Sequence, residues 1–218
     1  MVKKCLIIFI LCIGTVVSVA YAGVLPPKEF YVYNRAPWEK GQEVGFGYNL
    51  LTNMDIYAAP RSNEKVGCMI TGEPVQVIRT VAITHPRLYP VRLYRELKDM
   101  EVVVAEGDDT INFARRLQKQ SITIPAGATI YLLMYSGEGC YMGWYNNYII
   151  NFVSSFNIKN FPSLYGAEEP YLGEYIGHSP VEWEYWVKYR KADGTNGWGM
   201  YNREKLIIDY GRYEKVVE

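Results

Sequence analysis

The chain has 218 residues, which is long enough for one large domain or two small domains with cores of their own. Its 23 lysine and arginine residues balance 23 aspartate and glutamate residues, so the formal net charge at pH 7 is zero. A near-neutral chain lacks the basic surface with which proteins bind nucleic acid or anionic lipid. The composition therefore argues against both of these partners and leaves enzymes and binding proteins open.

Residues 1–22 have the form of a secretory signal peptide. A basic start at Lys3 and Lys4 precedes an apolar run, and the segment ends in an Ala-x-Ala pattern at Ala20 and Ala22. We expect cleavage after Ala22 and export to the periplasm or the cell surface, with an uncleaved membrane helix as the alternative. Cleavage would remove two basic residues and no acid, which leaves a mature chain with a net charge of −2 and no membrane span.

Two of the four cysteines, Cys5 and Cys12, fall within the predicted signal peptide. No small residue precedes Cys12, as a lipoprotein signal would require. The other two are Cys68 and Cys140. In an oxidising compartment such a pair suggests a disulfide, which would close a loop of about 70 residues and stabilise the fold by about 4 kcal/mol in the chain-entropy model. We predict this disulfide, with two buried, reduced cysteines as the alternative.

From Met54 onward, short apolar runs alternate with turn residues. The run from Val75 to Ile83 is rich in β-branched residues, and a Pro-x-Gly turn at Pro125 and Gly127 separates two further runs of this kind. Short runs that end at Gly, Pro or Asn are typical of small antiparallel barrels and sandwiches. We therefore predict a mainly β fold.

Two segments depart from this pattern. The stretch that begins with Asp109 or Thr110 places Ile111 and Leu117 at helical spacing, and either of its first two residues can cap a helix. We predict a short helix there. The tract at 154–180 is rich in proline, glycine and aromatic residues, and we expect a packed excursion that is also a candidate binding loop.

The segment that starts at Trp183 reads as a β-hairpin, with Asp193 and Gly194 in its turn. Because side chains alternate along a strand, Trp186 is the aromatic residue on the polar face, together with charged residues. In the return strand Trp198 shares a face with Met200. The residues predicted to face the core are Trp183, Tyr185, Val187 and Tyr189.

These residues resemble a known family. WVKYRKADGTNGWGMYN (186–202) resembles the closing hairpin of bacterial Src-homology-3-like (SH3-like) domains, in which Gly-Trp precedes the last strand. MDIYAAPRSNEKVGCMITGEPVQVI (54–78) resembles the opening half of such a domain, and ITIPAGATIYLL (122–133) repeats its turn-and-strand element. The opening half has no closing hairpin with a Trp, and Ala58 or Ala59 stands where the family has an Arg.

The resemblance implies two small SH3-like β-barrels in tandem, or one barrel with a large insertion. For the tandem, the expected boundaries follow the chain. After the signal peptide come an N-terminal extension at 23–47, a first module at 48–106 and a second module at 107–218, with the 154–180 excursion inside the second.

The resemblance also implies binding rather than catalysis, because exported domains of this kind usually recognise cell-wall peptides or protein partners. Exposed aromatic side chains offer a large contact area with a polar handle. We expect a non-catalytic, cofactor-free protein that recognises a peptidoglycan peptide or an envelope protein, with an inhibitor or immunity protein as the alternative. The candidate binding residues are Tyr57, Trp144, Tyr145, Trp186, Trp198 and Tyr201.

Cys140 and His178 occur in the chain order of a Cys-His cell-wall peptidase, which is a further alternative. Such an enzyme places its thiolate at the start of a helix, whereas Cys140 sits in a β-type run. The sequence has two histidines, His85 and His178, and no paired cysteines at zinc spacing. We therefore predict no metal site.

Overall fold

The computed structural model describes residues 23–35, 47–50, 52–107, 109–162, 167–201 and 206–207. The predicted signal peptide and residues 36–46 of the predicted N-terminal extension lie outside this part of the chain. Within it, the helical elements are two short 3-10 turns, η1 (Pro86–Leu88) and η2 (Ser155–Asn157). The prediction of a mainly β fold is confirmed. None of the described segments forms a helix long and apolar enough to cross a membrane.

The strands form two sheets. The first sheet has nine strands, and seven of them follow one another in a single path. In that order they are β17 (Leu206–Ile207), β2 (Gly47–Leu50), β5 (Pro74–Thr84), β15 (Trp183–Lys191), β16 (Asn196–Met200), β3 (Met54–Tyr57) and β4 (Lys65–Met69). Off this path, β1 (Phe30–Tyr33) pairs with β5 and, in parallel, with β8 (Thr110–Asn112).

The second sheet has eight strands, and its centre is a meander of β10, β11 and β12. Two-residue turns join these strands, and all four turn residues, Glu138, Gly139, Asn146 and Asn147, have positive φ, as tight hairpins require. In spatial order the strands are β13 (Ile158–Lys159), β14 (Gly173–Tyr175), β6 (Pro90–Leu93), β10 (Thr129–Gly137), β11 (Cys140–Tyr145), β12 (Tyr148–Ser154), β7 (Leu97–Val104) and β9 (Lys119–Ile124).

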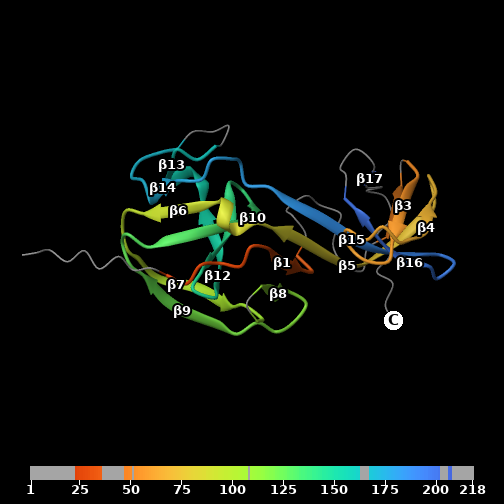
Figure 1. Cartoon of the computed structure of the whole chain (residues 1–218), viewed down its shortest axis with the longest axis horizontal. Helices are drawn as coiled ribbons and strands as arrows, with labels where there is room; N and C mark the ends of the chain where they lie inside the picture. Colours follow the sequence, from red (N-terminus) through yellow and green to blue (C-terminus); the bar gives the residue numbers. More distant parts are fainter. Residues whose placement is uncertain are drawn as a thin grey trace, which may run out of the picture.

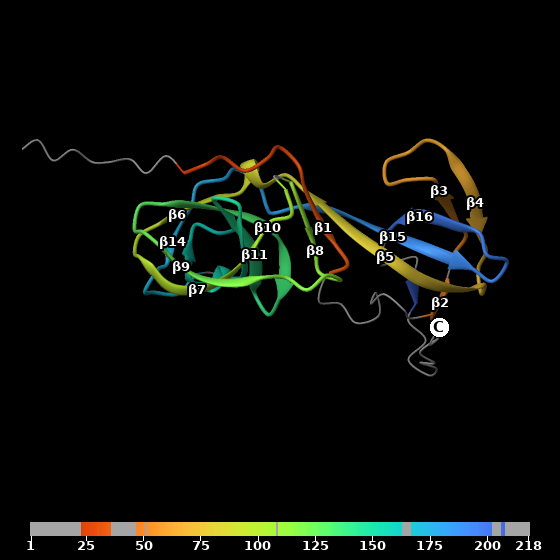
Figure 2. The ribbon, with the colours of Figure 1, turned by 90° about the horizontal axis from the view of Figure 1, so that it is seen from below.

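The molecule is elongated, with a strand pair running between its two ends (Figures 1 and 2). Strands β2, β3 and β4 gather at one end, and the second sheet forms the other. The long strands β5 and β15 connect them and pair antiparallel from Trp183 opposite Thr84 to Lys191 opposite Val75. Segments about a hundred residues apart in sequence therefore form the central ribbon of the molecule.

The pairing of β5 with β15 joins the two predicted modules. Strands β3, β4 and β5 come from the first module at 48–106, whereas β15 and β16 come from the second module at 107–218, yet all five lie in one sheet. The strands of the second sheet lie between β5 and β15 in sequence. The division into two tandem barrels is therefore not confirmed, and this connectivity is the one that an insertion between two paired strands would produce.

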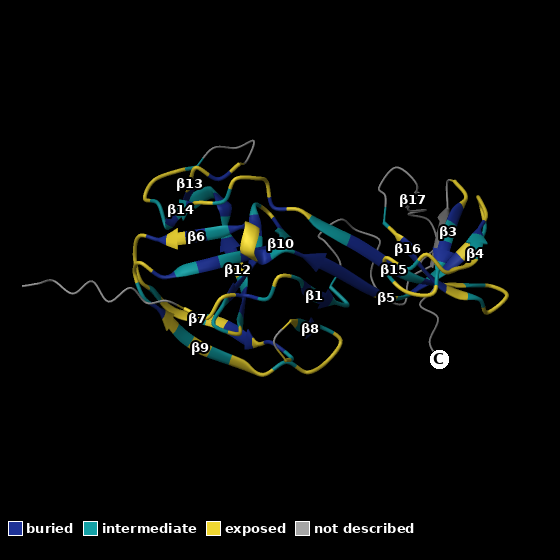
Figure 3. Cartoon of the chain, in the orientation of Figure 1, coloured by how far each residue is buried: buried dark blue, intermediate teal, exposed yellow. Residues whose placement is uncertain are grey.

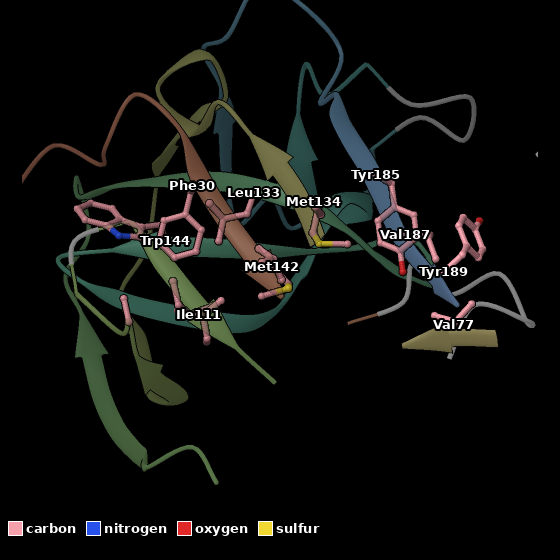
Figure 4. Packing of buried hydrophobic residues seen from close by; sticks show 14 of the residues in the cluster. Phe30, Val77, Ile111, Leu133, Met134, Met142, Trp144, Tyr185, Val187 and Tyr189 are labelled. Atoms are coloured by element: carbon pink, nitrogen blue, oxygen red, sulfur yellow. The ribbon is translucent and has the colours of Figure 1, made fainter. Parts of the chain in front are cut away.

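The main hydrophobic core runs along the inner side of the central ribbon. Figure 4 shows Phe30, Leu133 and Trp144 at one end of this cluster and Tyr185 and Tyr189 at the other. All five are at most 4% exposed. Each fully buried side chain of this size stabilises a fold by roughly 1.5–3 kcal/mol, so this continuous cluster ties both ends of the molecule to the β5–β15 ribbon. A second hydrophobic cluster is formed by buried side chains of the second sheet.

The predicted helix at Asp109 is wrong. Thr110 to Asn112 form β8, which pairs with β1 and buries Ile111, and the chain then turns into β9. The Asn112 side chain accepts a hydrogen bond from the Ala114 amide at 3.0 Å, which favours a turn after the strand. Helical spacing over a short, charged segment was a weaker signal than the pairing available beside β1.

The predicted disulfide between Cys68 and Cys140 is also wrong. Both cysteines are free thiols: Cys68 lies in β4 of the first sheet and Cys140 in β11 of the second. Each thiol contacts a nearby backbone carbonyl instead, that of Met69 for Cys68 and that of Glu138 for Cys140, at 3.5 Å. The two thiols belong to different sheets, which sequence spacing alone could not reveal.

The described part of the 154–180 tract is not a plain loop. It contains η2, β13 and β14, which extend the second sheet alongside β6. Ile158, Phe161 and Tyr175 bury their side chains in the second core cluster. Residues 163–166 lie outside the described part of the chain.

Candidate functional site

Three of the six predicted binding residues do not form a common surface with the others. Trp144 is buried, with 1% of its surface exposed, and packs edge-to-face on Tyr131 at 6.1 Å. The expectation that Trp144 is a surface residue is therefore wrong. Tyr145 packs half-buried against the second core cluster, and the Tyr201 ring contacts the Tyr185 ring at 5.8 Å on the core side of the first sheet.

The other three predicted residues, Tyr57, Trp186 and Trp198, come together. They belong to a third apolar cluster on the opposite side of the central ribbon from the main core. Val81 and Ile83 of β5 form its base together with the two tryptophans. Tyr31 and Tyr33 of β1, which lie in the predicted N-terminal extension, complete it.

Strand register arranges this side of the sheet in three rows, because directly opposed residues of neighbouring antiparallel strands share a face. We call the eleven side chains of these rows the aromatic face. The rows are, in order, Arg79, Lys188, Trp198 and Tyr57; then Tyr33, Val81, Trp186 and Met200; then Tyr31, Ile83 and Glu184.

Simple alternation builds this face. In β1, Phe30 and Val32 are fully buried against the main core, so Tyr31 and Tyr33 must point to the other side. Their rings stack with centroids 6.5 Å apart and an angle of 16° between the planes. The predicted alternation of the closing hairpin is confirmed in the same way, since Tyr185 faces the main core.

Two glycines fix the direction of Trp198. A Cβ atom at Gly197 would lie 2.7 Å from the Ile56 Cβ atom, and one at Gly199 would lie 2.7 Å from the Met54 Cε atom. β16 therefore packs its backbone directly on the core. The large Trp198 side chain of β16 therefore lies on the side of the sheet that faces away from the main core.

The tryptophans form the floor of the aromatic face. Trp186 is 8% exposed and Trp198 is 7% exposed, whereas Tyr31, Tyr33 and Tyr57 are only partly buried. Figure 3 shows β5 buried along much of its length, which agrees with packing on both sides of the ribbon. A ligand on this face would therefore meet the tyrosine rings first, with the tryptophans supporting them from below.

One edge of the aromatic face is closed by an ion cluster. The loop between β3 and β4 carries Arg61, whose Nε and Nη2 atoms donate to the Glu184 carboxylate at 2.8 and 2.5 Å. Its Nη1 atom donates to Glu29 at 2.7 Å. The Tyr31 hydroxyl also donates to Glu29, at 3.0 Å, and Trp186 Nε1 donates to Glu184 at 3.1 Å. The cluster thus connects the loop, β1 and β15.

Hydrogen bonds from Arg61 lower the pKa of both carboxyl groups, Glu29 and Glu184. The same contacts raise the pKa of the guanidinium group. Arg61 also has a positive φ of 58°, which is uncommon for a residue that is neither Gly nor Asn. His85 lies nearby, with Nδ1 4.0 Å from a Glu29 oxygen.

Cys140 and His178 do not form a pair in the described residues. Cys140 is 2% exposed at the start of β11, whereas His178 is exposed in the segment after β14. Burial raises the pKa of the Cys140 thiol, which disfavours the thiolate that a nucleophile needs. No three His, Cys, Asp or Glu side chains gather as metal ligands in the part of the chain that the structure describes.

Sequence reasoning missed Tyr31, Tyr33, Arg61 and Arg79 as members or neighbours of the aromatic face. The alternating FYVY motif was a usable signal for a strand with one aromatic side. No local pattern indicates that this strand pairs with β5.

We find no matching family model, no matching curated protein and no matching solved structure for this chain. The resemblance to SH3-like domains therefore stays a prediction.

Proposed function

We propose that the protein is an exported, non-catalytic binding protein whose aromatic face takes a cell-wall peptide or a segment of an envelope protein. The observation that carries this proposal is the composition of the face. It gathers tryptophan, tyrosine and arginine, the residue types that dominate binding energy at protein interfaces. The main core is a separate cluster on the opposite side of the same ribbon, and the three tyrosines of the aromatic face are only partly buried, which leaves their rings within reach of a ligand.

The arrangement also favours binding energetically. Tyrosine and tryptophan have few rotatable bonds, so a surface built from them loses little conformational entropy when a ligand docks. Here the stacked pair of Tyr31 and Tyr33 is held by the pairing of β1 with β5, and Trp186 is held by its hydrogen bond to Glu184. A preorganised aromatic surface of this kind suits an extended peptide.

Retention on purified peptidoglycan tests the proposal. The mature chain, residues 23–218, is compared with the variant Tyr31→Ala/Tyr33→Ala, which removes the two stacked rings without opening the main core. The matched control is Tyr94→Ala/Phe152→Ala, since these aromatic residues of the second sheet are 46% and 59% exposed. Circular dichroism of each variant checks that the fold is kept.

We expect the parent and the control to co-sediment with peptidoglycan and the tyrosine variant to lose at least tenfold in affinity. Equal retention of all three proteins would place the ligand elsewhere and contradict the role of the aromatic face. If the parent is not retained, the cell-wall ligand is excluded. Cross-linking from position 33 to envelope proteins then decides whether a protein partner occupies the face.

A further inference from the structure

Two positive charges face each other on the aromatic face. Arg79 of β5 and Lys188 of β15 are directly opposed in the antiparallel ladder, so their side chains leave the sheet on the same side. Like charges in this arrangement destabilise a sheet. Trp198 is the next residue of the same row, on β16. This like-charge pair therefore adjoins one of the two tryptophans of the floor.

Nothing in the described part of the chain neutralises this pair. No carboxylate lies within ion-pair distance of Arg79 or Lys188 among the described residues, although other surface cations do have such partners, such as Lys65 with Asp55 at 2.7 Å. The Arg79 guanidinium instead lies over the Tyr33 ring, 5.7 Å from its centroid. A cation–π contact of this length holds the side chain in place and leaves its positive charge uncompensated.

The opposite edge of the aromatic face, at Glu184, differs in its charge. There, two carboxylates, Glu29 and Glu184, share one guanidinium, that of Arg61, so a net negative charge remains. Rows two residues apart along a strand are separated by about 7 Å, which puts roughly 13 Å between the Arg79 row and the Glu184 row. The face thus has a cationic end, an aromatic middle and an acidic end, over the length of about four residues of extended peptide.

We infer that the ligand of the aromatic face is an acidic peptide, with a carboxylate group docked between Arg79 and Lys188 and the neighbouring part of the peptide over Tyr33 and Trp186. This inference rests on the proposed function and adds the charge and the orientation of the ligand. A carboxylate at this position would pair with both cations in charge-assisted hydrogen bonds. It would also remove the repulsion between them, which no described group of the protein does.

Binding of short peptides of defined charge tests the inference. The mature chain is titrated into fluorescently labelled hexaglutamate, with hexaglutamine as the uncharged peptide and tripolyphosphate as a competing phosphate anion. The variant Arg79→Gln/Lys188→Gln removes the cationic pair. The matched control, Arg92→Gln/Arg95→Gln, removes two exposed arginines from β6 and the residues that follow it.

We expect hexaglutamate to bind at least tenfold more tightly than hexaglutamine, and to lose at least tenfold in affinity in the Arg79/Lys188 variant but not in the control. Binding should weaken as salt is added, because the contact is ionic. Three results would overturn the inference. They are equal binding of the two peptides, equal binding by the parent and the Arg79/Lys188 variant, and tighter binding of tripolyphosphate than of hexaglutamate at this pair.

The same proteins separate this inference from the proposed function. If the mature chain is retained on peptidoglycan through Tyr31 and Tyr33 but does not bind hexaglutamate, the proposed function stands and the acidic ligand is wrong. If hexaglutamate binds at Arg79 and Lys188 while peptidoglycan is not retained, the acidic ligand stands and the cell-wall assignment falls.

Discussion

At the scale of single residues, Gly197 determines how closely β16 approaches the core. Replacement by alanine would place a Cβ atom 2.7 Å from the Ile56 Cβ atom, which is fixed close to its own backbone. We expect Gly197→Ala to lower the free energy of unfolding by about 1–3 kcal/mol, as overpacked cores do. Urea unfolding followed by tryptophan fluorescence measures this loss.

Gly67→Ala in β4, which pairs with the other edge of β3, is the matched control. Its Cβ atom would have its nearest neighbour at 3.6 Å, an ordinary contact, so stability should stay the same or rise by up to about 1 kcal/mol. Equal losses in Gly197→Ala and Gly67→Ala would contradict the close approach of β16 to Ile56.

Arg61 makes the stability of the fold depend on pH. The folded-state pKa values of Glu29 and Glu184 lie below the ordinary value of 4.5, chiefly because of hydrogen bonds from Arg61. The stabilisation is therefore present above pH 4.5 and is lost as the pH falls through the lowered values. Since the side chains are about one-third exposed, solvent screening limits the effect of Arg61→Gln at pH 7 to about 0.5–1 kcal/mol.

Chemical unfolding of the parent and of Arg61→Gln at pH 7 and at pH 3 tests this dependence. The difference between the two proteins should be largest at pH 7 and should shrink at pH 3. Lys65→Gln, which removes a more exposed ion pair on the surface, serves as the control and should change stability little at either pH. A difference that grows at acidic pH would show that Arg61 does not act through Glu29 and Glu184.

At the scale of elements, the β5–β15 ribbon contains an unfavourable pair that should be measurable. Replacing Lys188 by glutamine removes a directly opposed like-charge pair and keeps the contact of Arg79 with the Tyr33 ring, so we expect the unliganded protein to gain about 0.2–1 kcal/mol of stability. Thermal and urea unfolding at low salt measure the gain. The Arg92→Gln control should show none, and a loss of stability in Lys188→Gln would mean that the two charges are compensated in the folded protein.

The hairpin of β15 and β16 could be predicted from sequence, because its information is local. Alternation placed Tyr185 and Trp186 on opposite sides, and the Asp193 and Gly194 turn has the positive φ that its sequence suggests, 85° at Gly194. The prediction failed where local pattern and pairing disagreed. Ile111 follows helical spacing, yet β8 forms because β1 offers a strand partner and a core to bury it in.

At the scale of the whole molecule, pairing between strands far apart in the chain determines which side of a sheet each side chain occupies. The sequence alone does not show this pairing. Trp144 and Trp186 look alike in sequence, each in a short β-type run beside a tyrosine. Trp144 packs into the main core, whereas Trp186 lies over Val81 on the opposite side of the ribbon. The composition of the candidate site was partly predictable, but its location followed only from the pairing of β1, β5 and β15.

The arrangement of the sheets also determines the state of the cysteines. With Cys68 and Cys140 in different sheets, the purified mature protein should show two free thiols after denaturation without reductant. In the folded protein, Cys68 should react with a thiol reagent faster than the buried Cys140, whose pKa is raised by burial. The absence of titratable thiols after denaturation would show that a disulfide forms and that the sheets are arranged differently.

The most direct test of the aromatic face as a binding surface is hydrogen–deuterium exchange of the mature chain, with and without soluble peptidoglycan fragments. Our structure predicts slower exchange on binding in β1, in the second half of β5, and in β15 and β16, with little change in β9 and β13. Protection confined to β13, β14 and the 154–180 tract would contradict binding at the aromatic face, and no protection anywhere would contradict the cell-wall ligand.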